Sequence, residues 1–236
     1  MKCQDNWLKK GCTGPNVGRL QKQINDKKLG NLAVDEDFGP VTEATLKKCQ
    51  EKFGITIDGI YGNESTLAFS YYKPGLHLLK NIILDRQDNA WQCGPSTLKM
   101  GLASQGYNAL ESWLSSVAGT SQSNGTSVAG MLTAIKSYNN TYKTNLKTTN
   151  TGILPWTTIL NHIINNRSVM VRLQSFLNPN GGQHWVLITG INLDNQTVRF
   201  GDPSAGTRIT TLSDLKNRLQ YVIQRGITYP IIVLQK

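Results

Sequence analysis

The hydrophobic positions in the first third of the chain recur with the spacing of helices. Val17, Leu20 and Ile24 stand three and four residues apart, and the apolar positions of residues 44–53 follow a similar period. Such spacing places apolar side chains on one face of a helix, where they can pack against neighbouring elements. With a further helical pattern after residue 65, the sequence predicts a three-helix domain of about 60 residues.

A short motif occurs twice in this region. Residues 35–42 and residues 58–65 both read Asp, two residues, an aromatic residue, Gly, two residues and a hydroxyl residue. Each copy stands before a helical pattern, and its glycine allows a tight reversal of the chain. Pro40, directly after the first of these glycines, suits the first turn of a helix. The repeat therefore predicts two equivalent loops, each leading into a helix.

The remainder of the chain carries helical patterns first and strand patterns later. The predicted helices begin with one that Cys93 opens and continue over residues 109–117, 126–138, 156–164 and 211–219. The predicted strands are residues 168–173, 184–191, 197–200 and 231–234. Strands 184–191 and 197–200 are expected to pair antiparallel around a turn at Asp194 and Asn195. This order predicts an α+β fold, with helices packed on an antiparallel sheet.

A boundary between two domains is predicted near residue 75. Residues 71–75 read Tyr-Tyr-Lys-Pro-Gly, a composition that favours turns and connections. We therefore expect a helical domain over residues 1–75 and an α+β domain over residues 76–236.

Positive charge is concentrated in the second of these domains. The formal net charge of the chain is +10, and residues 77–236 carry 14 Lys and Arg against 6 Asp and Glu. Residues 1–76 carry 11 against 9. A basic domain attracts polyanions. No basic run with interleaved aromatic residues marks a nucleic-acid face, so no nucleic acid is expected, and an acidic cell-wall polymer fits the charge equally well.

The hydrophobic content of 39% is typical of a globular protein with real cores. No apolar run approaches the length of a membrane span, so no span is expected. The start of the sequence lacks the apolar core of a signal peptide. We expect a monomer that is either already a mature chain or leaves its host cell by a route other than general secretion.

The four cysteines do not form a disulfide scaffold. Cys3 and Cys12 lie close enough to pair, with Cys49 as an alternative partner, and spacing alone leaves the connectivity open. On a helix over residues 44–53, Cys49 falls on the apolar face, which predicts a core residue. Cys93 stands apart, with distinctive neighbours.

Cys93, His184 and Asp202 are the candidate catalytic residues. Cys93 precedes Gly94 and Pro95, which favour a helix start, and a helix N-terminus beside an imidazole lowers the pKa of a thiol. His184 enters a predicted strand, and Asp202 ends the next one, where its carboxylate can orient the ring. These are the nucleophile, the base and the orienting group of a cysteine hydrolase.

Other residues remain alternatives for these roles. Gln87, six residues before the cysteine, is the candidate donor to a developing oxyanion, with Asn89 and Gln92 nearby. The alternative bases are His77 and His162, and the alternative orienting residue is Asp194.

No cofactor or metal is expected. Asp35, Asp37 and Asp58 lack the spacing of a calcium loop, so they are predicted to cap helices.

The N-terminal motifs resemble the peptidoglycan-binding domain found on many wall hydrolases. The resemblance rests on residues 17–21, 35–42, 46–55 with Gln50, and 58–65. Cys49 stands where that family has an aromatic residue, and Glu36 stands where the first loop has a glycine. The resemblance implies a wall-binding domain, and these loop changes could alter which polymer it binds. A helical domain that serves only packing is the alternative.

The catalytic motifs resemble the papain-like cysteine peptidases of the double-glycine-leader processing type and their cell-wall-acting relatives. The resemblance covers residues 82–205 and rests on Gln87, Cys93-Gly94-Pro95, His184-Trp185-Val186 and Gly201-Asp202-Pro203. It implies Cys93 as nucleophile, His184 as base, Asp202 as orienting residue and Gln87 in the oxyanion hole. Gln92 replaces the family's acidic residue before the cysteine.

The same pattern also resembles the pseudomurein endoisopeptidases of viruses that infect methanogenic archaea. The small-residue run 119–127 could frame a peptide groove in either group. The two-domain combination favours a wall-lytic cysteine endopeptidase, a viral or proviral lysin, with pseudomurein preferred over bacterial peptidoglycan as substrate. The alternatives are a transglutaminase-like or acetyltransferase-like acyl transferase, a non-catalytic wall-binding protein, and a leader peptidase coupled to a transporter.

Overall fold

The computed structural model describes Cys3, residues 7–178 and residues 182–236. The chain divides into two compact units. The first contains residues 1–75 and 155–161, and the second contains residues 76–154 and 162–236. The domain boundaries 1–75 and 76–236 stay a prediction.

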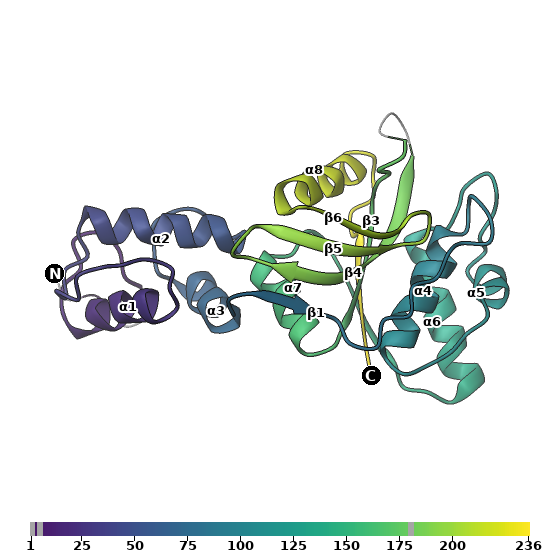
Figure 1. Ribbon diagram of the computed structural model, residues 1–236, viewed down its shortest axis with the longest axis horizontal. Helices are drawn as coiled ribbons and strands as arrows, with labels where there is room; N and C mark the ends of the chain where they lie inside the picture. Colours follow the sequence, from purple (N-terminus) through teal and green to yellow (C-terminus); the bar gives the residue numbers. More distant parts are fainter. Residues whose placement is uncertain (1–2, 4–6, 179–181) are drawn as a thin grey trace. The chain divides into compact units, whose positions relative to one another are not determined.

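The first unit contains the three predicted helices, α1 (Pro15–Asp26), α2 (Pro40–Phe53) and α3 (Asn63–Tyr71) (Figure 1). Proline occupies the first turn of both α1 and α2, where the missing N–H costs no helical hydrogen bond. The apolar faces of the helices meet in a core, in which the largest fully buried side chains include Phe38, Phe53 and Phe69. The helical period of the sequence therefore predicted this unit correctly.

Two buried glutamines organise the repeated loops. Gln21 Nε2 donates to Asp35 Oδ1 at 2.7 Å and to the Asp37 carbonyl at 3.0 Å, while Gln21 Oε1 accepts from the Glu36 N–H. The second loop repeats this pattern around Gln50. Its Nε2 donates to Asp58 Oδ1, the Ile60 carbonyl and Ser65 Oγ, and its Oε1 accepts from the Gly59 N–H. One glutamine on a preceding helix thus holds each loop motif.

The prediction that the aspartates of these loops cap helices is wrong. The N-cap residues of α2 and α3 are Gly39 and Gly62, which make no side-chain cap bond. Asp35 and Asp58 instead accept from the glutamines and from a backbone N–H two residues later, which closes a turn within each loop. Their contribution is to loop shape and not to helix initiation.

Replacing Gln50 by leucine is expected to destabilise the first unit by about 2–4 kcal/mol. Leucine has a similar volume, but it leaves the Gly59 N–H and the Asp58 carboxylate without their buried partner. Denaturant unfolding of the full chain, followed by the fluorescence of a tryptophan placed in this unit, measures the loss. Gln220→Leu on the exposed side of α8 (Leu212–Ile223) is the matched control. Equal stability of the two variants would contradict the bridging role.

The cysteines of the first unit differ in their bonding. Cys3 and Cys12 form a disulfide with a Cα–Cα distance of 5.6 Å, which resolves the connectivity that spacing left open. Cys49 is a free thiol buried in α2, as its place on the apolar face predicted. Burial raises the pKa of the Cys49 thiol to about 11, so this thiol is unreactive at neutral pH.

The second unit is built on an antiparallel sheet with the order β2-β7-β3-β4-β5-β6, and β1 pairs with β4. The strands are β1 (Leu76–Leu78), β2 (Lys147–Thr151), β3 (Ser168–Gln174), β4 (Gln183–Asn192), β5 (Thr197–Asp202), β6 (Gly206–Thr211) and β7 (Ile231–Gln235). The helices of this unit are α4 (Cys93–Ser104), α5 (Glu111–Val117), α6 (Val128–Tyr142) and α8, and α7 (Trp156–Ile164) begins in the first unit and ends in the second. The predicted α+β class is confirmed.

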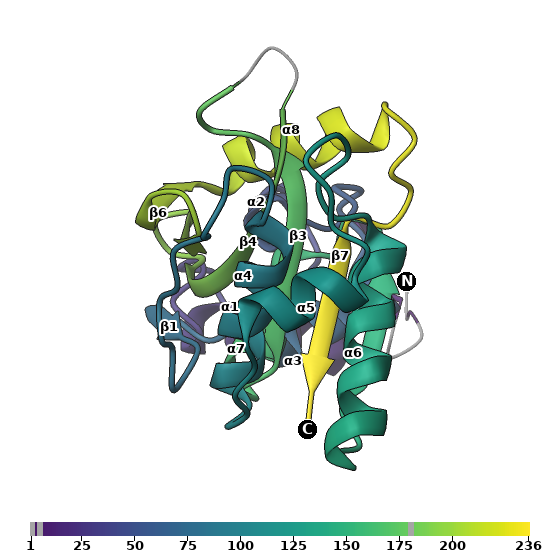
Figure 2. The ribbon, with the colours of Figure 1, turned by 90° about the vertical axis from the view of Figure 1, so that its right-hand side faces the viewer.

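The packing of this unit brings α4 to the centre of the sheet. Helix α4 contacts β3 and β4, and α8 contacts β3 (Figure 2). A Cβ at Gly101 would meet Met170 Sδ at 3.1 Å, so the absence of a side chain lets α4 approach β3 closely. The first residue of α4 is Cys93, and the first residues of β4 include His184. Close packing of these two elements therefore positions the candidate nucleophile and base.

Three strands were not predicted from the sequence. Strands β1 and β6 are short or have an exposed face, and β2 reads Lys-Thr-Thr-Asn-Thr, without an apolar residue. β2 pairs along its whole length with the buried strand β7, which supplies the hydrophobic surface that β2 lacks. Edge strands of this kind carry little alternation for sequence analysis to detect. In the part of the chain that the structure describes, no helix has the length and apolar character of a membrane span.

Candidate active site

Cys93 is the first residue of α4, and its side chain lies almost completely inside the protein with 8% of its surface exposed. Burial raises the pKa of a thiol. Here a hydrogen bond and the positive charge of His184, together with the backbone N–H groups of Trp185 and Gly94, outweigh burial and lower the pKa below its ordinary value. The local environment thus favours a thiolate at residue 93.

His184 connects the thiol to a carboxylate. Its Nε2 lies 2.7 Å from Asp202 Oδ1, which leaves Nδ1 for the contact with Cys93. Burial alone would lower the pKa of the ring, but the hydrogen bonds and charges of Asp202 and Cys93 raise it to about 9. At neutral pH the ring is therefore an imidazolium, and its charge favours the thiolate form of Cys93. The histidine that contacts Cys93 is therefore His184. The alternative bases, His77 and His162, lie on β1 and α7.

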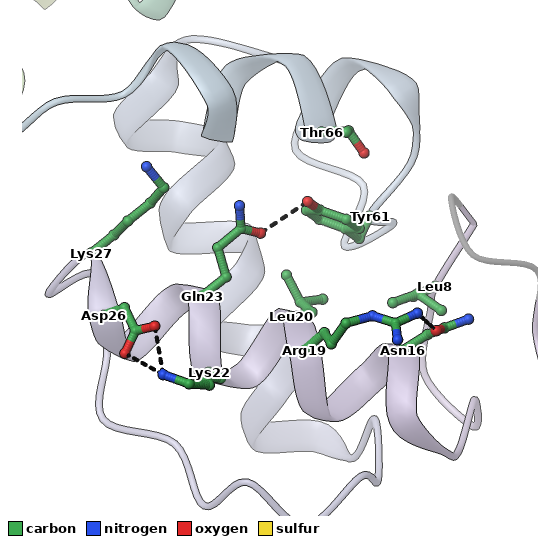
Figure 3. A pocket seen from close by; sticks show the side chains of 10 residues that line it. All are labelled: Leu8, Asn16, Arg19, Leu20, Lys22, Gln23, Asp26, Lys27, Tyr61 and Thr66. Atoms are coloured by element: carbon green, nitrogen blue, oxygen red, sulfur yellow. Dashed lines mark hydrogen bonds and ion pairs between the residues drawn. The ribbon is translucent and has the colours of Figure 1, made fainter.

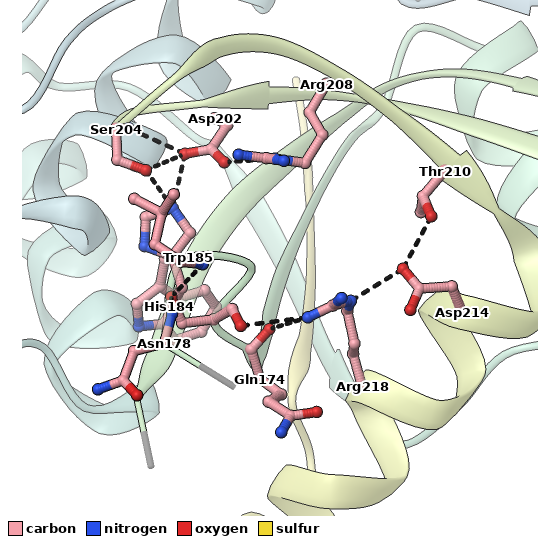
Figure 4. A network of polar contacts seen from close by, with 12 residues as sticks. Gln174, Asn178, His184, Trp185, Asp202, Ser204, Arg208, Thr210, Asp214 and Arg218 are labelled. Carbon is pink, nitrogen blue, oxygen red and sulfur yellow. Dashed lines mark hydrogen bonds and ion pairs between the residues drawn. The ribbon is translucent and has the colours of Figure 1, made fainter. Parts of the chain in front are cut away.

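Asp202 ends β5 and is 1% exposed. Its Oδ1 accepts from the Ser204 N–H at 2.9 Å and Ser204 Oγ at 2.7 Å, while its Oδ2 accepts from Arg208 Nε at 3.1 Å (Figure 4). Although burial raises the pKa of this carboxyl, the His184 imidazolium and the Ser204 donors lower it well below its usual range. Asp202 therefore stays ionised and can hold the histidine ring.

Sequence analysis missed the two residues that support this carboxylate. Ser204 follows Asp202 by two residues, the position from which a backbone N–H closes a turn on an aspartate, so a local signal existed. Arg208 lies on β6, a strand that was not predicted, and only the β5–β6 pairing brings it to Asp202. No local pattern could have identified Arg208.

The amide groups before the cysteine are engaged with one another. Gln87 Nε2 donates to the Asn89 carbonyl at 2.8 Å, and Asn89 Nδ2 donates to Gln92 Oε1 at 2.8 Å. Gln92 Nε2 in turn donates to Ser115 Oγ on α5. The structure therefore places the Gln87 amide in the loop that leads into α4. A role of this amide at an oxyanion stays a prediction.

A cavity of about 430 Å³ opens beside the thiol. Its walls include Cys93, Arg172, Gln183, Trp185 and residues 122–126 of the small-residue run. This run lies close to the catalytic helix: a Cβ at Gly94 would meet the Thr126 side chain at 2.5 Å, and Trp185 Nε1 donates to the Thr126 carbonyl at 2.9 Å. Residues 122–126 thus form one wall of the cavity. A peptide groove along this run stays a prediction.

A buried carboxyl group holds the loop before the nucleophile. Glu111, at the start of α5, accepts from the Asp88 N–H at 3.0 Å through Oε1. Burial, together with the nearby carboxyl groups of Asp85 and Asp88, raises the pKa of Glu111 to about 7. Asp85 itself accepts from Lys99 Nζ at 2.6 Å and from Ser96 Oγ at 3.0 Å. A protonated Glu111 supplies the donor that its buried Oε2 otherwise lacks.

Glu111→Gln is expected to flatten the pH dependence of stability between pH 4.5 and 7. The folded chain holds a proton on Glu111 that the unfolded chain, with a pKa near 4.5, releases; stability from this group is therefore complete below pH 4.5 and declines as pH rises toward 7. The amide mimics the protonated form. Thermal unfolding across this range should show a wild-type slope of a few degrees that the variant lacks. An unchanged slope in Glu111→Gln would contradict this assignment.

A second cavity, of about 760 Å³, lies in the first unit (Figure 3). Arg19, Lys22, Asp26 and Lys27 of α1 and its C-terminal end line it together with Tyr61, whose hydroxyl donates to Gln23 Oε1 at 3.0 Å. Charged groups of both signs, amide groups and an aromatic ring thus line one cavity. Among the described residues, no group of three or more His, Cys, Asp or Glu side chains is arranged to hold a metal ion.

The fold and the Cys93–His184–Asp202 arrangement define the class of this protein: it is a papain-like cysteine peptidase. The family model described as "Peptidase_C39 like family" matches residues 79–226, more than half of the chain. The protein belongs to this family. A second model, "Putative peptidoglycan binding domain", matches residues 13–68. The combination indicates a cell-wall peptidase.

The chain is similar to solved structures at low sequence identity. A "putative C39-like peptidase" from Bacillus anthracis has a TM-score of 0.52 and 11% identity over 69% of this chain and 98% of that one. The peptidase domain of Streptococcus ComA, a bi-functional ABC transporter involved in quorum sensing, has a TM-score of 0.48 and 18% identity over 64% of this chain and 96% of that one. No curated protein matches the chain.

Proposed function

We propose that the protein is a wall-lytic cysteine endopeptidase that cuts peptide or isopeptide cross-links of a cell wall. The observation that carries this proposal is the Cys93–His184 hydrogen bond, oriented by Asp202, in a chain that also has a peptidoglycan-binding domain. A wall-binding domain, predicted over residues 1–75, raises the local concentration of an insoluble substrate around a catalytic domain over residues 76–236. The hollow beside Tyr61 is our candidate for the wall-polymer site.

The proposed reaction is acyl transfer to water. The Cys93 thiolate attacks the carbonyl carbon of the scissile amide and forms a tetrahedral intermediate. His184 donates its Nδ1 proton to the leaving amine, and the acyl group stays on sulfur as a thioester. A water molecule then attacks the thioester while His184 accepts its proton, which releases a carboxylic acid and restores the thiolate. Asp202 keeps the ring oriented and stabilises the imidazolium throughout.

Gln87 is the proposed side-chain donor to the oxyanion, together with the backbone N–H of Cys93. Its Nε2 donates to the Asn89 carbonyl, so a second N–H of the same amide remains for the substrate. Its Oε1 is buried and accepts no hydrogen bond from the described residues, and a loop adjustment on substrate binding would relieve that cost.

Pseudomurein is the proposed substrate, because the Cys-His-Asp motifs resemble those of the pseudomurein endoisopeptidases. On this proposal the protein is a viral or proviral lysin that acts on the wall at host lysis. Bacterial peptidoglycan is the second candidate, and the match of residues 13–68 to a peptidoglycan-binding family favours it. Both polymers contain peptide cross-links, so one catalytic centre suits either substrate.

The discriminating experiment incubates the protein with purified pseudomurein and, separately, with purified bacterial peptidoglycan. Loss of turbidity and release of amino groups from one wall alone would identify the substrate. Joined peptides in place of shortened ones would support an acyl transferase instead. If neither wall changes but both sediment the protein, the non-catalytic wall-binding function would replace the proposal.

A further inference from the structure

Arg172 lines the cavity that contains the Cys93 thiol. It lies in β3, between β7 and β4 in the sheet, and its backbone N–H donates to the Pro230 carbonyl at 2.8 Å. In the register of β3 and β4, Arg172 stands opposite Trp185, the residue that follows His184. The sheet therefore fixes the point from which the guanidinium enters the catalytic cavity.

The guanidinium of Arg172 has no bonding partner among the described residues. It is half-buried, and none of the hydrogen bonds or ion pairs among the described residues involves it. Other arginines of this unit are satisfied: Arg208 binds Asp202, and Arg218 binds Asp214 at 2.8 Å. Burial lowers the pKa of Arg172, while the Cys93 thiolate opposes that change, yet a guanidinium stays charged at any physiological pH. A partly desolvated cation without a partner is costly.

Gln183 also lines this cavity. It stands two residues before Trp185 on β4, so both side chains lie on the face of the sheet that Arg172 also occupies. Its Oε1 is buried and accepts no hydrogen bond within the described part of the chain. The cavity thus presents the Arg172 guanidinium, a cationic donor fork, and a ligand that satisfies it presents a carboxylate.

We propose that Arg172 binds a carboxylate next to the scissile bond and thereby selects bonds that carry one. The proposal rests on the peptidase function proposed above and adds the substrate class. A carboxylate beside the scissile bond comes from two sources. One is an acidic side chain in a linear peptide, and the other is the free α-carboxylate that remains where a cross-link joins residues through a side chain.

Two pairs of synthetic peptides separate these sources. The linear pair has Glu or Gln beside the scissile bond, and the side-chain-linked pair has a free α-carboxylate or its carboxamide. The carboxylate member of at least one pair should be cleaved with a kcat/KM about tenfold to a hundredfold above its amide twin, as expected for hydrogen bonds to charged groups. Preference within the linear pair alone, or within the side-chain-linked pair alone, identifies the source.

Arg172→Gln should abolish this preference, because it should lower kcat/KM for the carboxylate peptides about tenfold to a hundredfold more than for their amide twins. Arg172→Lys keeps the charge without the planar fork and should retain part of the preference. Arg225→Gln removes the same charge from an exposed position over the Tyr221 ring and should behave like the unmodified protein. An equal loss on carboxylate and amide peptides in Arg172→Gln would overturn the proposal, because it would mean that Arg172 acts on the thiolate alone.

Binding to the Cys93→Ala protein keeps the proposal testable if no peptide is cleaved. Titration calorimetry should give a lower Kd for a carboxylate peptide than for its amide twin, and Arg172→Gln in that background should equalise them. Equal values with Arg172 present would overturn the proposal. Wall release with no carboxylate preference would refute this inference alone, whereas carboxylate preference without wall release would refute only the proposed wall substrate.

Thermal unfolding distinguishes substrate binding from a structural role. Because the Arg172 guanidinium makes no hydrogen bond or ion pair with the described residues, Arg172→Gln should unfold at a temperature equal to or above that of the unmodified protein. A clear decrease would show that the guanidinium supports the fold.

Discussion

Cys93→Ala should lower kcat on cross-linked wall peptides by at least about 10⁴-fold. The Cys93 thiol forms a hydrogen bond with His184, and alanine has no group that can form the acyl intermediate. Since removal of the sulfur leaves the cavity and the wall-binding domain intact, wall binding should persist while amino-group release stops. Quantification of new amino groups, with sedimentation of the protein on the same wall, checks both expectations.

The second free cysteine provides a control within the chain. Cys49 is buried in α2, and its pKa is raised to about 11, whereas the pKa of Cys93 is lowered. Cys49→Ala should therefore retain activity. Iodoacetamide near neutral pH should alkylate Cys93 alone, because only a thiolate reacts rapidly. Loss of activity in Cys49→Ala, or substantial turnover by Cys93→Ala, would contradict Cys93 as the nucleophile.

The local part of the catalytic site was predictable because its information lies in short segments. Gly94 and Pro95 indicate a helix start at Cys93, and the apolar run after His184 indicates a strand. The β4–β5 hairpin then brings the strand that Asp202 ends beside the strand that His184 begins. Each step needs only the period of the pattern and a turn signal.

The remaining parts of the site depend on packing between distant segments. Arg172 interrupts an apolar strand, and the sequence pattern identifies it only as a polar residue in a buried element. The cavity that it lines exists because α4 packs on β3 and β4. Arg208 reaches Asp202 only through the β5–β6 pairing. Such contacts carry no local period, so one sequence without its fold gives no reason to choose these arginines over the others.

The repeated loops also combine features that a short sequence segment reveals with contacts that only the packed structure reveals. The Asp and Gly positions of the motif were visible in the sequence, but the function assigned to the aspartates was wrong. Gln21 and Gln50 are the residues that organise the loops, and each lies on the helix before its loop. A buried glutamine that satisfies several backbone groups leaves no pattern within the motif itself.

Asp202→Asn should move the alkaline limb of the kcat/KM profile to lower pH. The active form needs the imidazolium, so activity falls as pH rises through the pKa of His184, which is about 9 in the unmodified protein. Oδ1 accepts from His184 and twice from Ser204, whereas Oδ2 accepts from Arg208 alone. An asparagine would therefore place its oxygen at the Oδ1 position and preserve the ring orientation, but it would remove the negative charge that stabilises the imidazolium.

The two substitutions at this position separate charge from orientation. At pH 8, Asp202→Asn should lose about twofold to tenfold in kcat/KM, because a His184 pKa lowered by one to two units leaves about half to a tenth of the imidazolium at that pH. Asp202→Ala also frees the ring and should lose about 10²–10⁴-fold. Asp214→Asn, which removes a carboxylate paired with Arg218 on α8, is the matched control and should leave the profile unchanged. If Asp202→Asn kept its alkaline limb near pH 9, the charge of Asp202 would not be what holds the proton on His184, and the thiolate of Cys93 would have to hold it alone.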